Sequence, residues 1–129
     1  MQISTRERDF IVDVFPLWQK MVQLNRVFNN PQILKVFHGA DWDIVWLHRD
    51  FDLRVSGLFD TYQAAKILNL EQKSYGAILK KYTGVDTDKS YQMADWRIRP
   101  LTEAMLLYAR IDTHYLLEIY DKMKEELQK

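Results

Sequence analysis

Short apolar runs alternate with helix-like segments along this chain, and this alternation constrains the fold more than any other feature of the sequence. The apolar runs at residues 9–14, 33–38 and 55–59 have the length and composition of buried strands. Helical spacing of apolar residues follows them, most clearly over 16–27 and 41–51. The first segment has one apolar stripe, made of Leu17, Met21, Leu24 and Phe28. The side of the second that is expected to be buried consists of Ile44, Val45, Trp46, Leu47 and Phe51. Strands that are separated by helices tend to pair in parallel, because each crossover returns the chain to the same end of the sheet. The sequence therefore predicts an α/β fold with a mainly parallel sheet flanked by helices.

Capping residues mark two further helices in the second half of the chain. Asp60 can cap a helix over 62–68, and Ser74 begins another helix that ends near Gly84. Residues 83–101 then form a long connection with weak secondary-structure signals. Connections of that length in compact domains are usually functional or mobile.

Composition excludes several classes of function. The numbers of basic and acidic side chains are equal, 18 each, so nothing indicates a protein that binds nucleic acid through net charge alone. The absence of cysteine rules out disulfides, thiol catalysis and cysteine-bound zinc. No run is long and apolar enough to span a bilayer, and residues 1–8 lack the apolar core of a signal peptide. We expect one soluble, intracellular domain without membrane contact over residues 1–129.

Asp43 is the first candidate for a functional residue. It lies one turn into a helix that directly follows the strand ending at His38. Ligands of open α/β sheets bind beyond the carboxyl ends of the strands, where a helix N-terminus also favours anions. The alternative is that Asp41, as the helix cap, and Asp43 only complement the helix dipole.

Tyr108 and Asp112 form the second candidate. The last helix is expected to start near Pro100 and to run to the end of the chain, and a spacing of four residues places both side chains on one face of it. A carboxylate beside a phenol can hold a metal ion and orient a water molecule. The same spacing also fits an ordinary solvated helix face, so it does not decide between the two interpretations.

The amino-acid sequences of four whole segments help to decide between the functional and the structural interpretation of these residues. They are residues 35–51 (KVFHGADWDIVWLHRDF), 57–65 (GLFDTYQAA), 89–101 (KSYQMADWRIRPL) and 108–123 (YARIDTHYLLEIYDKM). Together they resemble the RNase D-like 3′-5′ exonucleases of the DEDDy group, in order and over nearly the whole chain. The similarity is closest to the catalytic exonuclease of the eukaryotic nuclear exosome. This resemblance implies a partial RNase H-like (DEDD exonuclease) fold whose first strands are absent.

The resemblance also implies a chemistry. In this family four acidic residues bind two divalent ions, Mg²⁺ or Mn²⁺, and a tyrosine positions the attacking water. The second motif corresponds to Asp43 and the third to Tyr108 and Asp112, so Asp43 and Asp112 are the expected metal ligands. The first motif, Asp-x-Glu, would fall upstream of residue 1. We therefore expect this chain alone to bind metal weakly and to degrade RNA poorly or not at all.

Other residues near these motifs have less specific expectations. His38 is expected to satisfy a hydrogen bond within the fold, and His114 to support the site at most. Trp96 and Arg99 are expected to pin the long loop against the final helix, while Arg97 is free for another role, such as RNA contact.

Two functions follow as hypotheses. The first is a 3′-5′ exoribonuclease domain that acts on single-stranded RNA 3′ ends, with exosome subunits as partners and the nucleus as the location, all implied by the resemblance. The second is a non-catalytic fragment of the same family that binds nucleic acid or acts as a scaffold. Loss of the first strands would also leave an unpaired sheet edge, which favours dimerisation or aggregation.

Overall fold

The computed structural model describes all 129 residues and contains two separate two-stranded sheets. In the first, β1 (Gln2–Ser4) pairs antiparallel with β2 (Asp9–Ile11); in the second, β3 (Lys35–Phe37) pairs parallel with β4 (Leu58–Asp60). The two sheets share no hydrogen-bonded strand pair. The α/β class is confirmed, but the expectation of one mainly parallel sheet is wrong for this chain, since one of the two pairs is antiparallel.

The antiparallel pair arises from a tight turn that sequence reasoning missed. Thr5 organises this turn, because its hydroxyl oxygen accepts hydrogen bonds from the backbone N–H groups of Glu7 and Arg8, at 3.3 and 3.1 Å. A connection this short can join antiparallel strands only. Residues 2–4 gave no strand signal because the strand is short and two of its three residues are polar.

The helix expected over 16–27 forms in two parts. A 3₁₀ helix, η1 (Trp18–Leu24), leads into one turn of α-helix, α1 (Asn25–Phe28). Met21 and Phe28 of the expected apolar stripe are buried, whereas Leu17 stays 39% exposed. The stripe is therefore only partly used.

Helix α2 (Ala40–Phe51) follows β3 directly and packs against η1. Gly39 precedes it with a φ of 70°, a left-handed conformation that glycine adopts without strain. The expected cap Asp41 is wrong, because Asp41 already lies within the first turn. The expected burial of Val45 and Trp46 is also wrong, since they are 52% and 49% exposed on the side of α2 that faces solvent.

Four helices complete the chain: α3 (Thr61–Ile67), α4 (Tyr75–Thr83), α5 (Glu103–His114) and α6 (Leu116–Leu127). The caps expected for α3 and α4 are confirmed, since Asp60 accepts from the Tyr62 N–H and Ser74 from the Ala77 N–H. The single last helix expected from the sequence is broken at Tyr115, which separates α5 from α6.

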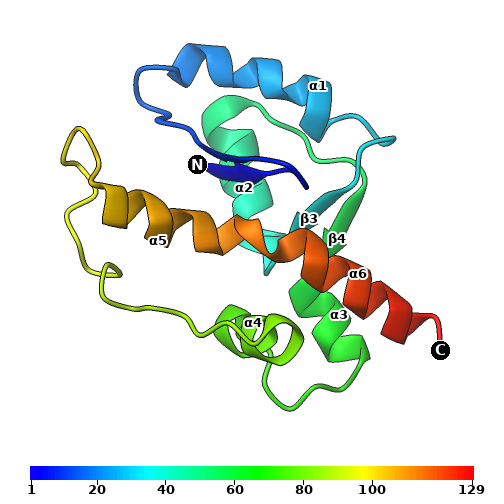
Figure 1. Ribbon diagram of the computed structural model, residues 1–129. Helices are drawn as coiled ribbons and strands as arrows, with labels where there is room; N and C mark the ends of the chain where they lie inside the picture. Colours follow the sequence, from blue (N-terminus) through cyan, green and yellow to red (C-terminus); the bar gives the residue numbers. More distant parts are fainter.

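The main hydrophobic core belongs to one part of the molecule. It joins α3, α4 and α6 through Ala64, Ala65, Ile78, Leu79, Tyr82, Ile119 and Met123. Helix α5 instead covers the β1–β2 hairpin, while α6 packs against β3, α3 and α4. The α5–α6 pair thus spans both sheets, as Figure 1 shows.

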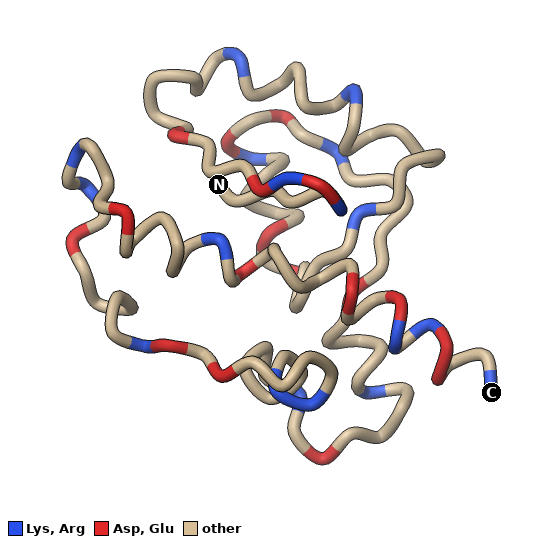
Figure 2. Tube along the Cα trace, in the orientation of Figure 1, with Lys and Arg blue, Asp and Glu red and all other residues tan.

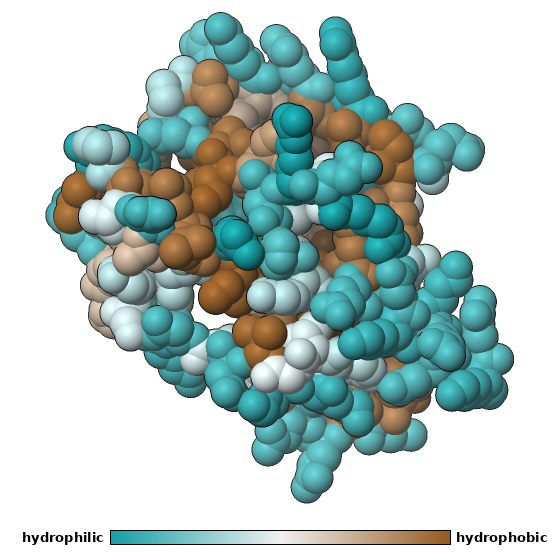
Figure 3. Space-filling model, viewed as in Figure 1, coloured by the Kyte–Doolittle hydropathy of each residue, from teal (hydrophilic) through white to brown (hydrophobic).

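The surface is mixed in charge and hydropathy. Acidic and basic residues occur in short groups along the C-terminal helix and are interspersed elsewhere (Figure 2), in agreement with the balanced charge. Apolar side chains are visible between the helices at the top and α5 (Figure 3). No helix has the length and apolar character needed to cross a membrane.

Candidate active site

Asp43 stands in the first turn of α2, immediately beyond the carboxyl end of β3. Its side chain is half-buried and takes part in no hydrogen bond or ion pair. Burial raises the pKa of the Asp43 carboxyl, and the nearby Asp60 adds to this effect. A cation would therefore stabilise the ionised Asp43 carboxylate, and no basic side chain supplies one.

Asp112 lies on α5, beside the hairpin. Its carboxylate accepts one long hydrogen bond, 3.4 Å, from the Gln2 side-chain amide of β1. Burial raises the pKa of the Asp112 carboxyl, although the residue as a whole keeps contact with solvent. This second candidate carboxylate also lacks a basic partner.

Aspartates elsewhere in the chain behave differently. Five of them bond to an arginine or a histidine, and their pKa values are lowered: Asp9, Asp13, Asp50, Asp95 and Asp121. The two aspartates named from the sequence are instead unpaired, and their pKa values are raised. Perturbed carboxyl groups without a structural partner are typical of functional sites.

Two aromatic side chains connect the end of β3 with α5. The His38 ring lies 5.7 Å from the Tyr75 ring, and its Nδ1 lies 2.8 Å from the Thr61 hydroxyl. The Tyr75 hydroxyl donates to the backbone carbonyl of Ile111, next to Asp112 in the chain. Burial, with a contribution from Asp112, raises the pKa of Tyr75. His38 thus satisfies a hydrogen bond within the fold, as expected.

Tyr75 is the residue of this region that sequence reasoning missed. In the sequence it is one aromatic residue among many, at the start of a helix that Ser74 caps. Its reach across to α5 depends on a contact between residues 36 positions apart, which no local pattern reveals.

Tyr108 lies against the long loop that precedes α5. The rings of Tyr91 and Trp96 each lie 5.8 Å from the Tyr108 ring. The expected role of Trp96 in pinning the loop to the last helix is confirmed. For Arg99 it is wrong, because its guanidinium bonds Asp13 at 2.8 Å and not the helix.

Arg97 pairs with Asp95 two residues earlier in the same loop. Its side chain is 91% exposed, so solvent reaches nearly all of it.

The donor set suits a hard divalent cation but is small. Carboxylate oxygens are the ligands that Mg²⁺ and Mn²⁺ prefer, and neither Asp43 nor Asp112 is neutralised by a basic side chain. No group of three or more histidine, aspartate or glutamate side chains comes together in the chain as a metal centre. These residues therefore fit part of a two-ion site.

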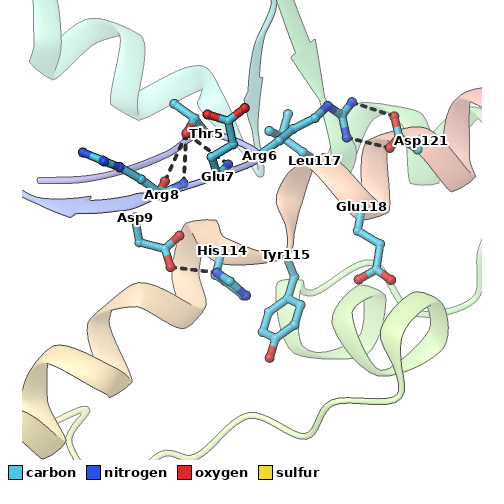
Figure 4. Close-up of a pocket in the computed structure, with 10 residues that line it drawn as sticks. All are labelled: Thr5, Arg6, Glu7, Arg8, Asp9, His114, Tyr115, Leu117, Glu118 and Asp121. Atoms are coloured by element: carbon cyan, nitrogen blue, oxygen red, sulfur yellow. Dashed lines mark hydrogen bonds and ion pairs between the residues drawn. The ribbon is translucent and has the colours of Figure 1, made fainter.

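A pocket lies elsewhere. It has a volume of about 400 Å³ and is formed by the hairpin turn and the α5–α6 junction (Figure 4). Four of its polar side chains form two pairs: Asp9 binds His114 at 2.8 Å, and Arg6 binds Asp121 at 2.8 Å. None of the three predicted site residues lines it. We regard it as a junction that joins the hairpin to the helices, with His114 as a supporting residue.

Comparison with known proteins identifies the family of the chain. A family profile described as "3'-5' exonuclease" matches residues 1–128. The human protein "Exosome complex component 10" is 59% identical over 127 residues, which cover 98% of this chain and 14% of that protein. "Exosome complex exonuclease RRP6" of Saccharomyces cerevisiae is 54% identical over 98% of this chain and 17% of its own length. The chain thus spans less than a fifth of either relative.

Solved structures share the fold. The catalytic core of RRP6 from Trypanosoma brucei superimposes with a TM-score of 0.94 at 44% identity, covering 99% of this chain and 35% of that one. Brucella melitensis NrnC with bound Mg²⁺ superimposes with a TM-score of 0.70 at 24% identity, covering 81% of this chain and 51% of that one. At that identity the second likeness concerns the fold alone.

Proposed function

This chain belongs to the 3′-5′ exonuclease family, and we propose that it forms most of a metal-dependent exoribonuclease domain that shortens RNA from the 3′ end. One observation carries the proposal. Asp43 and Asp112, which come from separate stretches of the sequence, are both carboxylates with raised pKa values and no basic partner. Such carboxylates are suited to a divalent cation and costly to keep without one.

Each candidate residue has a distinct part in this proposal. Asp43 and Asp112 hold Mg²⁺ or Mn²⁺, and a pair of such ions stabilises the attacking and the leaving oxygen of a phosphodiester. The Tyr108 hydroxyl orients the attacking water, and the rings of Tyr91 and Trp96 limit how far the phenol can turn. His38 and Tyr75 keep the end of β3 in a fixed relation to α5.

The remaining acidic ligands would come from residues beyond these 129, since the sequence contains no Asp-x-Glu. The fold is compatible with an added strand, because β1 and β3 are each hydrogen-bonded to a strand on one side only. RNA as substrate, exosome subunits as partners and a nuclear location belong to the same proposal, supported by the names of the relatives.

The decisive experiment uses the longest natural polypeptide that contains this sequence. We expect Mg²⁺-dependent removal of nucleotides from 5′-labelled single-stranded RNA, and no shortening of RNA whose 3′ hydroxyl is blocked. Asp43→Asn and Asp112→Asn should abolish the activity, whereas Asp50→Asn, on the same helix as Asp43, should retain it. An active Asp43→Asn variant would refute the proposed site.

The non-catalytic alternative predicts a different outcome of the same experiment. A polypeptide that binds RNA, folds normally and never shortens it at any Mg²⁺ or Mn²⁺ concentration would be a binding or scaffolding protein.

A further inference from the structure

The Asp60 carboxylate closes the beginnings of two helices at once. Its Oδ1 accepts from the Tyr62 N–H of its own helix α3 at 2.8 Å and from the Gly39 N–H at 2.8 Å. Its Oδ2 accepts from the Ala40 N–H of α2, also at 2.8 Å. The parallel register explains this reach, since Asp60 of β4 lies directly beside Phe37 of β3. Asp60 is therefore the shared cap of α2 and α3.

Helix α2 depends on this shared cap because it has none of its own. The first amides of a helix find no acceptor within the helix and need one from outside. Gly39 stands at the capping position and has no side chain, and no side-chain hydrogen bond from α2 itself caps the helix. The two acidic residues of the first turn, Asp41 and Asp43, are already inside the helix. The only side chain that bonds Gly39 and Ala40 lies 21 and 20 residues further along the chain, respectively.

We propose that Asp60 is a positioning residue for Asp43: it fixes the first turn of α2 against α3 and thereby sets where the Asp43 carboxylate stands. The inference rests on the proposed function for the role of Asp43 as a metal ligand. Asp60 itself does not take that role, because three backbone N–H groups already occupy its two oxygens. Its negative charge is balanced by the positive ends of two helix dipoles.

The simpler interpretation is that Asp60 caps α3 alone. The Asp60→Ser variant distinguishes this interpretation from a cap shared by α2 and α3. A serine hydroxyl can still accept from the Tyr62 N–H, as Ser74 does for α4. It is too short and has too few acceptor sites to bind Gly39 and Ala40 as well. Asp60→Ser therefore keeps the cap of α3 and removes the connection to α2.

The test uses the longest natural polypeptide that contains this sequence, as in the activity experiment, and two measurements. In Asp60→Ser, amide hydrogen exchange at Gly39 and Ala40 should accelerate about tenfold or more, while exchange at Tyr62 changes little. Titration with Mn²⁺ alone should give an affinity about tenfold weaker than that of the unchanged chain. Asp60→Asn, which keeps an oxygen for two of the three N–H groups, should fall between the two.

Ser74→Ala is the matched control, because it removes the cap of α4, which carries none of the proposed ligands. It should lower stability to a similar extent and leave the Mn²⁺ affinity unchanged. Equal loss of Mn²⁺ affinity in Ser74→Ala and Asp60→Ser would overturn the inference, as would unchanged exchange at Gly39 and Ala40 in Asp60→Ser.

Failure of the proposed function gives a different result. If the longest natural polypeptide that contains this sequence binds no Mn²⁺, Asp43 is not a ligand, and the proposed function loses its support. The positioning by Asp60 is then decided by exchange at Gly39 and Ala40 and by the backbone order parameter of Asp43, which should fall in Asp60→Ser.

Discussion

The indole of Trp96 lies 5.8 Å from the phenol ring of Tyr108, with an angle of 31° between the ring planes. The Trp96 Nε1–H donates to the Tyr91 carbonyl at 3.2 Å, so the indole is held at its polar end as well. Together with the Tyr91 ring, which also packs on Tyr108, Trp96 thus anchors the long connection to α5.

Trp96→Ala should lower the free energy of unfolding by about 2 kcal/mol, roughly half the cost for a fully buried tryptophan, since Trp96 is only partly buried. Urea unfolding followed by circular dichroism measures this. Trp42→Ala is the control, because Trp42 is 69% exposed and its removal should change stability by less than about 0.5 kcal/mol. Equal effects of the two substitutions would contradict the anchoring role of Trp96.

Asp43→Asn should stabilise the metal-free chain at pH 7 by roughly 0.5 kcal/mol, since it removes a half-buried charge without a partner. The pKa of Asp43 is raised above its ordinary value of 3.8, so the folded chain binds this proton more tightly than the unfolded chain. The penalty for the ionised form is therefore present above the folded pKa and disappears as the pH falls to 3.8 and below. Unfolding at pH 7 and pH 4 should show the advantage of Asp43→Asn shrinking with acid.

Asp9→Asn should change stability at pH 7 in the opposite direction to Asp43→Asn. Burial opposes ionisation of Asp9, but hydrogen bonds from Ser4 and His114 outweigh it and lower the pKa below 3.8. Asp9 therefore contributes stability above pH 3.8, and this contribution is lost as the pH falls through the folded pKa. Asp9→Asn should destabilise the chain at pH 7, and a stabilising effect there would contradict this assignment.

Lys35→Met should destabilise the chain by about 2 kcal/mol or more, because three backbone carbonyls lose their donor. The buried Lys35 ammonium donates to the carbonyls of Val27, Asn30 and Ile33, and it holds the end of α1 against β3. Burial lowers the pKa of Lys35. The three carbonyl oxygens are the hydrogen-bond partners of its ammonium group. Thermal unfolding measures the loss, and Lys124→Met, at an exposed position, should cause almost none.

Gln2→Pro should reduce self-association of the chain without breaking the hairpin. Met1 and Val12 exchange backbone hydrogen bonds, so by alternation the backbone groups of Gln2 point to the open edge of β1. Proline removes the Gln2 N–H from that edge, and the first residue of a strand is a position that tolerates it. Analytical ultracentrifugation should show fewer dimers than in the unchanged chain. Ile3→Pro, which acts on the β2 side, should instead unfold the hairpin.

The sequence predicted best the elements whose signals are local. Ser74 and Gly84 bound α4 as expected, and Asp60 caps α3. Each of these depends on a side chain or a backbone angle within three residues of the helix end. The α/β class followed from the alternation of strands and helices, which is also a local pattern.

Features that depend on distant contacts were not predictable. The start of α2 was assigned to Asp41, while the actual cap, Asp60, is distant in sequence and adjacent only because β3 and β4 pair in parallel. The break at Tyr115 lies between two helices that share one apolar pattern. The exposure of Val45 and Trp46 depends on which elements surround α2, and their spacing could not reveal it.

The site residues also have some properties that the sequence predicts and others that depend on the folded structure. Asp43, Tyr108 and Asp112 were selected by motif resemblance, because spacing alone also fitted ordinary helix faces. The structure adds that Asp43 and Asp112 have no basic partners, a property that no sequence pattern expresses.

The main core joins α3, α4 and α6, whereas the β1–β2 hairpin lies outside it under α5. A molecule built this way opens in stages, since contacts within each unit are denser than contacts between units. The hairpin amides are then exposed by local fluctuations, and those of α4 and α6 only when the whole chain unfolds. Since Asp112 lies on the helix that covers the hairpin, local opening of the hairpin should uncover this half of the candidate site before the main core unfolds.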